Sequence, residues 1–287
     1  MSTIIEKSVT VDKTKKIKVM CEMYRSANEV AADCEKRPIT DSCFRDVRKG
    51  DADKWKWNGV ESYEHALDLM RHGYQPTVEK LKDQLKISRQ GNGKRISFVN
   101  NIVGANPVVP LAMMGVPNCM IDMRMKPIKC KVVDVYYDMT MACGVSPEEI
   151  IKNGQKLLGV VLDLERAGYR FNLYGVQTYC GGSDVDILAV KIKSASQPID
   201  LKRMSFPLTH VGFFRVIGFD WYSKTPKGKY RSGYGCALGY ELNDGQIKRF
   251  AKEMFGDNAV YISAAKIGKE DEEHLKGVLT NDAKNVD

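Results

Sequence analysis

The sequence predicts an α/β fold, namely a mostly parallel open sheet with helices on both faces. The first observation is a dense run of β-branched and aromatic side chains over residues 132–137, which is typical of a strand buried on both faces of a sheet. The second is a well-marked helix after this strand, with Ser146 as N-cap, Pro147 in its first turn and Gly168 beyond its end. A further strand over residues 169–173 completes a strand–helix–strand crossover, the repeating unit of parallel sheets.

Two regions are predicted to precede an α/β domain over residues 129–268. Residues 1–54 are expected to form an N-terminal arm and a helix. Residues 1–18 alternate charged and β-branched side chains, as an edge strand or a flexible arm does, and residues 20–49 favour helix. Residues 55–128 are expected to form a helical and irregular region that packs on the sheet.

Two helices open the second of these regions. Ser62 is placed to cap a helix that Gly73 ends, and residues 77–87 alternate acidic and basic side chains, as a solvent-facing helix does. The basic, glycine-bearing loop over residues 89–95 lacks the spacing of a phosphate-binding loop, so we interpret it as a hairpin turn.

An irregular apolar segment follows over residues 96–125. It is rich in glycine, proline and methionine and has no regular period, so we expect it to wrap the face or edge of the sheet. Its methionines either fill gaps in the core or form a patch that docks a partner, because methionine suits both irregular packing and adaptable surfaces.

Strands and helices alternate after the crossover. A short glycine-bearing link implies that the strand over residues 185–192 runs antiparallel to the strand before it. The remaining expected elements are a helical stretch over 198–208 that continues to residue 219, a strand over 236–242, a turn at 243–245, a helix over 246–255 and a strand over 259–263. The polar tail over residues 269–287 is expected to fray.

Composition limits the classes of protein that this chain can represent. Its 287 residues carry 44 Lys and Arg against 36 Asp and Glu, a net charge of +8 that weakly favours an anionic partner such as a nucleic acid. Eight cysteines are scattered without a CxxC pair, which indicates reduced thiols and a cytosolic setting. No apolar stretch approaches the roughly 20 residues of a membrane-spanning helix, so we expect a soluble protein that does not bind membranes.

Two carboxylates mark the ends of predicted strands. Asp138 ends the first strand of the crossover and Asp244 follows a later one. Ligands of open α/β sheets bind beyond the carboxyl ends of parallel strands, so these acids and the Thr140 hydroxyl could meet around Mg²⁺, which prefers oxygen ligands. The alternative is that both acids cap helices or fix turns. A nuclease that adds Asp184 or Asp186 is also open, because paired carboxylates that hold Mg²⁺ suit phosphoryl transfer.

The same acids belong to two short motifs that follow buried strands. These motifs are Asp138-Met139-Thr140-Met141-Ala142 and Leu242-Asn243-Asp244-Gly245. With the order of elements, they make residues 129–265 resemble a von Willebrand factor A-like domain, which implies a Rossmann-like fold and a metal whose shell a partner's carboxylate often completes. Thr140 matches the first serine of the family's Asp-x-Ser-x-Ser motif, whereas Ala142 has no oxygen to replace the second. The resemblance therefore implies a damaged metal site.

Three further segments carry a second resemblance. Over roughly residues 55–220 the chain looks like an uncharacterised protein family of tailed bacteriophages, which implies a phage origin but no biochemical activity. The segments are Trp57-Asn58-Gly59 with Ser62-Tyr63-Glu64-His65-Ala66-Leu67 and Gly73, then Val103-Gly104-Ala105-Asn106-Pro107-Val108-Val109-Pro110 with Gly115-Val116-Pro117-Asn118-Cys119-Met120, and Leu164-Glu165-Arg166-Ala167-Gly168-Tyr169-Arg170.

Catalytic motifs do not appear in the sequence. None of the four histidines lies beside a nucleophile motif, and GxSxG, HExxH, Walker-type and GxGxxG patterns are absent. His210 lies in an apolar segment, so we interpret it as a core or helix-end histidine rather than a general base. These observations favour a protein that is not an enzyme.

The loop over residues 224–235 is the strongest candidate contact for nucleic acid or an acidic partner. It interleaves cationic side chains with rings that can stack on bases, although an ordinary exposed loop is the alternative. The candidate residues are Lys224, Lys227, Lys229, Tyr230 and Arg231.

The expected function is that of a non-enzymatic phage protein whose A-like domain serves as a protein-interaction module or as an accessory to virion assembly or packaging. Such a protein would act in the cytoplasm of the infected bacterial host or in the virion, with a protein partner or a second copy of itself. Two alternatives stay open: a nucleic-acid-binding protein that uses basic loops, and a divalent-metal-dependent enzyme. No cofactor is expected for an interaction module, and Mg²⁺ would be the cofactor of the metal-dependent enzyme.

Overall fold

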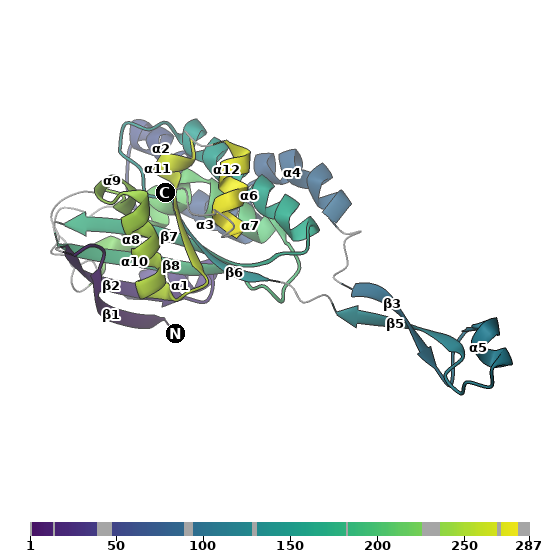
Figure 1. Ribbon diagram of the computed structural model, residues 1–287. Coiled ribbons are helices and arrows are strands. Elements are labelled where there is room, and N and C mark those ends of the chain that lie inside the picture. Colours follow the sequence, from purple (N-terminus) through teal and green to yellow (C-terminus); the bar gives the residue numbers. More distant parts are fainter. Residues whose placement is uncertain are drawn as a thin grey trace.

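A six-stranded sheet forms the centre of the body, in the order β1-β2-β8-β7-β6-β9 (Figure 1). Its strands are β1 (Thr3–Thr10), β2 (Lys16–Tyr24), β6 (Val132–Asp138), β7 (Arg170–Gly181), β8 (Asp184–Lys193) and β9 (Ala259–Ser263). The computed structural model describes residues 2–13, 15–38, 48–88, 94–127, 131–181, 183–225, 236–268 and 271–280.

The sheet is mixed in direction. β6 runs parallel to β7 and β9, and β2 runs parallel to β8, whereas β1–β2 and β7–β8 are antiparallel pairs. The α/β class and the antiparallel β8 are thus confirmed, and the prediction of a mostly parallel sheet is wrong. The reason is that the N-terminal segment forms a hairpin that pairs with β8. Sheet strands therefore come from both sides of the boundary expected at residue 129.

Helices cover both faces of the sheet. On one face lie α1 (Ala27–Lys36), α3 (Tyr63–His72), α6 (Pro147–Arg166), α7 (Leu201–Thr209), α8 (Phe219–Ser223) and a π-helical turn, η2 (Phe213–Gly218), which share the larger apolar core. On the other face, α9 (Leu238–Glu241) and α10 (Asp244–Phe255) pack on a smaller core. The peripheral helices are α2 (Ala52–Asn58), α4 (Gln75–Ser88), α11 (Ala264–Ile267) and α12 (Glu272–Thr280).

The strand–helix–strand unit predicted around β6 is present. β6 lies inside the sheet between β7 and β9, and its side chains are buried from Val135 onward. The Ser146 hydroxyl accepts a hydrogen bond from the backbone N–H of Glu149 (3.2 Å), so α6 begins where the capping residues place it. The Ser62 cap of α3 is likewise present, since its hydroxyl accepts a bond from His65 N (3.0 Å).

Three local expectations are wrong. Residues 20–24 belong to β2 rather than to a helix, and α9 replaces the strand expected over residues 236–242. The polar tail contains the helix α12, which packs on the core through Leu275 and Leu279. Each of these segments is short or only weakly periodic, so its partners elsewhere in the chain decide its conformation.

Residues 94–127 form an arm that projects from the body (Figure 1). Because β3 and β5 pair with each other over their whole lengths, the arm satisfies its backbone hydrogen bonds internally. The expectation that this segment wraps the main sheet is therefore wrong. The arm contains β3 (Lys94–Asn101), β4 (Asn106–Pro107), α5 (Val109–Met113) and β5 (Met120–Pro127), with strand order β3-β5-β4.

Within the described residues, no helix is both long enough and apolar enough to cross a membrane.

Candidate functional site

Asp138, the first predicted metal ligand, ends β6 in a closed hydrogen-bond network. Its side chain is fully buried. One carboxylate oxygen accepts a hydrogen bond from the backbone N–H of Thr140 (3.0 Å). The other accepts bonds from the hydroxyls of Thr178 on β7 (2.9 Å) and Tyr261 on β9 (2.6 Å). The carboxylate thus joins three strands at one end of the sheet.

The second predicted ligand, Thr140, is engaged in the same way. Its hydroxyl accepts a hydrogen bond from the backbone N–H of Thr178 (2.8 Å) and lies 3.4 Å from the carbonyl oxygen of that residue. Burial raises the pKa of Asp138 above its ordinary value, while the bonds from Tyr261, Thr140 and Thr178 act in the opposite direction. Asp138 and Thr140 therefore use their oxygens to hold strands together.

Asp244, the third predicted ligand, is not brought to Asp138. It is the first residue of α10, its side chain is 89% exposed, and it forms an ion pair with Lys266. The neighbouring Asn243 caps α10 with a reciprocal bond to Gln246. Nowhere in the described ranges do three or more His, Cys, Asp or Glu side chains gather to hold a metal ion.

The basic loop predicted to contact nucleic acid is described only at its start. Lys224 is 4% exposed and forms an ion pair with Asp220 on α8 (2.9 Å). Tyr63 and Arg48 also bond to the Asp220 carboxylate, each at 2.9 Å. Lys224 therefore neutralises a buried acid and does not present its charge at the surface. Lys227, Lys229, Tyr230 and Arg231 lie outside the described residues.

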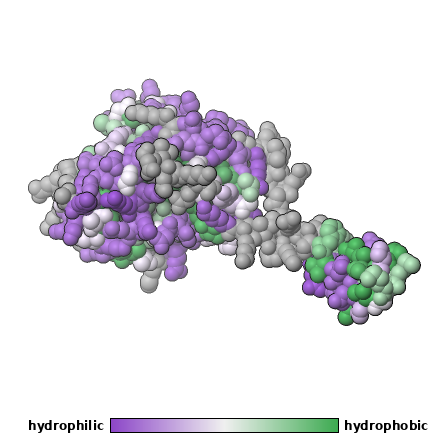
Figure 2. Space-filling view, in the orientation of Figure 1, coloured by the Kyte–Doolittle hydropathy of each residue, from purple (hydrophilic) through white to green (hydrophobic). Residues whose placement is uncertain are grey.

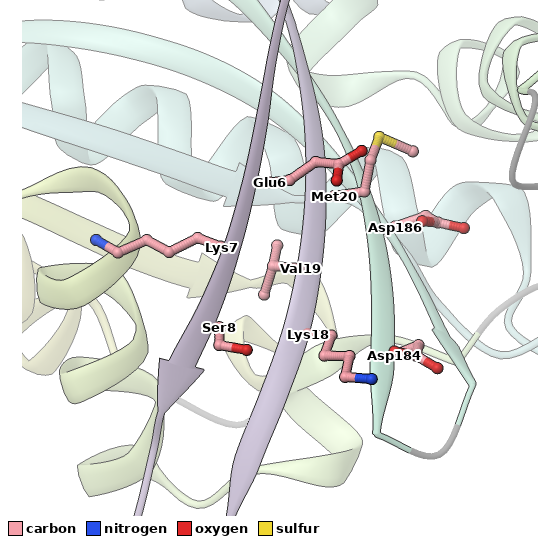
Figure 3. A pocket seen from close by; sticks show the side chains of 8 residues that line it. All are labelled: Glu6, Lys7, Ser8, Lys18, Val19, Met20, Asp184 and Asp186. Atoms are coloured by element: carbon pink, nitrogen blue, oxygen red, sulfur yellow. The ribbon is translucent and has the colours of Figure 1, made fainter.

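Two of the four acids considered for a nuclease line a hollow of about 290 Å³ on the β1–β2–β8 part of the sheet (Figure 3). Asp184 and Asp186 lie there with Glu6, but neither Asp138 nor Asp244 lines this hollow. Figure 3 shows Lys18 close to Asp184, as the pairing of β2 with β8 requires. The hollow thus mixes both signs of charge and does not assemble the predicted catalytic carboxylates.

The arm carries an extensive exposed apolar surface. Seven of the ten large apolar side chains that are most exposed in the described part of the chain lie between residues 98 and 123. Met113 is 84% exposed, Val103 75% and Met114 74%. Figure 2 shows apolar residues gathered over this end of the molecule. We define the arm surface as Phe98, Ile102, Val103, Val109, Met113, Met114 and Met123.

A family model described as a domain of unknown function, DUF7192, matches residues 7–283. The chain belongs to the DUF7192 family. The DUF7192 match begins within β1 and extends beyond α12, so it includes both the body and the arm. No curated protein and no solved structure matches the DUF7192 chain.

Sequence patterns pointed to the exposed apolar arm of the DUF7192 chain only indirectly. The methionines of residues 96–125 suggested either core filling or a docking patch, and the structure places Met113, Met114 and Met123 at the surface. No periodic signal distinguishes these alternatives, because their exposure depends on how far the arm projects. None of the six cysteines of the described residues forms a disulfide: Cys21, Cys34, Cys119, Cys143, Cys180 and Cys236.

His210 is a buried helix-end histidine, as the sequence predicts. It follows α7 as its C-cap, and its ring nitrogen accepts a hydrogen bond from the backbone N–H of Gly212 (3.0 Å). The rings of Phe206 and Tyr74 pack against it. Burial, with a smaller effect from His65, lowers the pKa of His210 from 6.5 to about 4.

This lowered pKa predicts an acid-dependent loss of stability. Between pH 6.5 and about 4, the unfolded chain binds a proton on His210 that the folded chain does not bind. The free energy of unfolding should therefore decrease as the pH is lowered through this window, and His210 should contribute up to about 3 kcal/mol of the decrease. Urea unfolding of the wild type and of His210→Gln at several pH values measures the effect. Equal pH dependence in the two proteins would contradict it.

Proposed function

We propose that this DUF7192 protein is a non-enzymatic interaction module that binds a partner protein through the arm surface. The observation that carries the proposal is the concentration of exposed large apolar side chains on the projecting arm. Contiguous apolar surface of this kind marks sites of protein contact in soluble proteins. The body supports the arm as a scaffold, and its most conspicuous carboxylate, Asp138, is engaged in holding strands together.

The side chains of the arm surface suit a protein partner. Burying one Val or Met side chain contributes about 1.5 to 3 kcal/mol, so a few of these residues supply enough energy for a specific contact. Met113 and Met114 also adapt their shape to the surface they meet, because methionine is unbranched and flexible. An apolar pocket or groove on the partner is the complement that this surface requires.

The phage setting belongs to the proposal as well. The resemblance of residues 55–220 to a tailed-phage family supports an accessory role in virion assembly or packaging, in the infected host or in the virion. The von Willebrand A-like order of residues 129–265 is likewise proposed, as the body that carries the arm. Nucleic-acid binding is not favoured by the described residues, because Lys224 is buried against Asp220.

Site-specific photo-crosslinking in the native host tests this function. We expect a photoreactive amino acid at Met113 to give one discrete protein adduct, identified by mass spectrometry. The same group at Tyr240, an exposed aromatic residue of the body, should not give that adduct. An adduct of twice the chain mass would make the partner a second copy. The same adducts at both positions, or none at Met113, would contradict the proposal.

The arm surface should contribute little to the stability of the isolated protein. Met113→Lys combined with Met114→Lys is expected to change the free energy of unfolding by no more than about 0.5 kcal/mol, because both side chains are largely exposed. Urea unfolding monitored by circular dichroism measures this change. A loss of several kcal/mol would mean that the methionines fill a core and are not available to a partner.

A further inference from the structure

The outer edge of β9 has backbone groups that pair with no other strand of the described residues. β9 is the last strand of the sheet and pairs only with β6 among the described strands. The backbone N–H of Asp134 bonds to the carbonyl of Asn258 (3.1 Å), so Asn258 faces β6. In a parallel ladder alternate residues face the same neighbour, so Val260 and Ile262 also face β6. The N–H and C=O of Tyr261, and the N–H of Ser263, therefore point away from β6.

This edge lies at the bottom of a groove of about 290 Å³. Ile247 and Ala251 of α10 form one wall, and Val278 of α12 contributes to the other. These helices pack on opposite faces of the sheet, so the groove follows the strand between them. Ser263 lines the groove, and its hydroxyl is buried beside Gly239 of α9 without a hydrogen-bond partner among the described residues.

The opposite edge of the sheet is protected in a way that β9 is not. β1 carries Glu6 and Lys7, and the backbone N–H of Thr10 donates a hydrogen bond to the Glu253 side chain (2.9 Å). Charged residues and capped donors are the usual protection of edge strands against pairing. β9, with the sequence AVYIS, contains no charged residue. Its recessed edge is therefore open to pairing with a strand that fits the groove.

The charges around the groove specify what kind of strand fits. Lys248, Lys266 and His274 line it, and Asp244 is the only acid that does so among the described residues. Asp244 is already paired with Lys266. The groove thus combines apolar walls with excess positive charge, which favours a peptide with apolar side chains and flanking carboxylates.

We propose that the β9 groove binds an extended acidic peptide segment of a partner protein, which adds to the sheet as a seventh strand. Backbone bonds to Tyr261 and Ser263 supply the pairing, apolar side chains of the peptide contact Ile247, Ala251 and Val278, and its carboxylates meet the cations. This site is distinct from the arm surface and does not depend on the function proposed for it.

An acetylated and amidated nonapeptide of five central valines with two glutamates at each end, titrated into the full-length chain, tests the site. We expect nuclear magnetic resonance to show shifted and exchange-protected amides at Tyr261 and Ser263. A matched peptide that is N-methylated at every residue keeps the side chains but loses the backbone donors on both edges, so its binding should be lost. Binding by both peptides alike, protection elsewhere than β9, or no binding at millimolar peptide would overturn the proposal.

Two exposed lysines of α10 provide a matched pair of variants. Lys248→Glu, in the groove, is expected to weaken binding of the nonapeptide by about twofold to fivefold. Lys252→Glu makes the same change of charge outside the groove lining, at a residue paired with Asp257, and should leave the affinity unchanged. Equal weakening by both variants would show that net charge, not the groove, attracts the peptide, and would overturn the site.

Discussion

Replacement of Asp138 by alanine is expected to lower the free energy of unfolding by about 3 to 5 kcal/mol. The substitution removes the acceptor of three buried donors, namely the hydroxyls of Tyr261 and Thr178 and the backbone N–H of Thr140. Each donor left without a partner in the interior costs about 1 to 3 kcal/mol, and partial relaxation reduces the sum. Urea unfolding at neutral pH measures the change, with an intact m-value as evidence of a comparable folded state.

The predicted metal ligand Asp244 is the matched control. Asp244→Ala should change the free energy of unfolding by no more than about 0.5 kcal/mol, because the side chain is exposed and its ion pair with Lys266 is near the surface. The same experiment tests the magnesium hypothesis. If Mg²⁺ raised the melting temperature of the wild type but not of either variant, the two acids would share an ion and the structural role of Asp138 would be wrong.

The second large effect is expected at Asp220. Asp220→Ala should destabilise the protein by about 3 to 5 kcal/mol, because it leaves the ammonium group of Lys224 buried without its counter-ion. Tyr63 loses a hydrogen-bond acceptor in the same change. The hydrogen bond from Tyr63 to Asp220 ties α8 to α3 and thereby to the core. Loss of this bond should also expose surface near α8.

A paired substitution separates the charge effect from lost packing. Asp220→Leu combined with Lys224→Met replaces both charges by apolar groups of similar size, and this double variant should recover most of the stability that Asp220→Ala loses. Thermal and urea unfolding of the double variant, of Asp220→Leu alone and of Lys224→Met alone complete the double-mutant cycle. If Asp220→Ala were nearly neutral, Lys224 would not depend on Asp220, and its assignment as a buried counter-ion would fail.

Local sequence signals predicted the crossover around β6 because its determinants are neighbours in the chain. Ser146, Pro147 and Gly168 mark the ends of a helix whatever the rest of the protein does. The pairing of β2 with β8 joins segments more than 150 residues apart, and nothing in either segment specifies the other. The mixed sheet could therefore not be derived, although both strands have the side-chain pattern that a sheet requires.

The surroundings of Asp138 were predicted in part. The sequence places Asp138 and Thr140 at the end of a buried strand, and they lie there in one network. Their partners Thr178 and Tyr261 come from other strands, 40 and 123 residues along the chain from Asp138. These partners occupy the oxygens that a cation would need, and no local motif announces them.

For the arm, the sequence indicated the composition but not the position of the segment. Its composition indicated an unusual segment, but the choice between a core-filling and a docking role depends on where the segment lies. Strands β3 and β5 pair with each other and leave α5 beyond the body. Met113 ends this helix and Met114 caps it, and both are exposed. Exposure of these residues is a property of the whole fold, so the sequence alone left both roles open.

The interaction role is tested most directly by the fraction of protein that crosslinks through a photoreactive group at Met113 when Val103→Lys and Val109→Lys are also present. Our account predicts that this fraction falls about tenfold, because two charges placed in an apolar contact cost more than the roughly 1.4 kcal/mol that a tenfold loss requires. Tyr240→Lys, on the body, should leave the fraction unchanged. A folded Val103→Lys/Val109→Lys protein that crosslinks as well as the wild type would contradict the account.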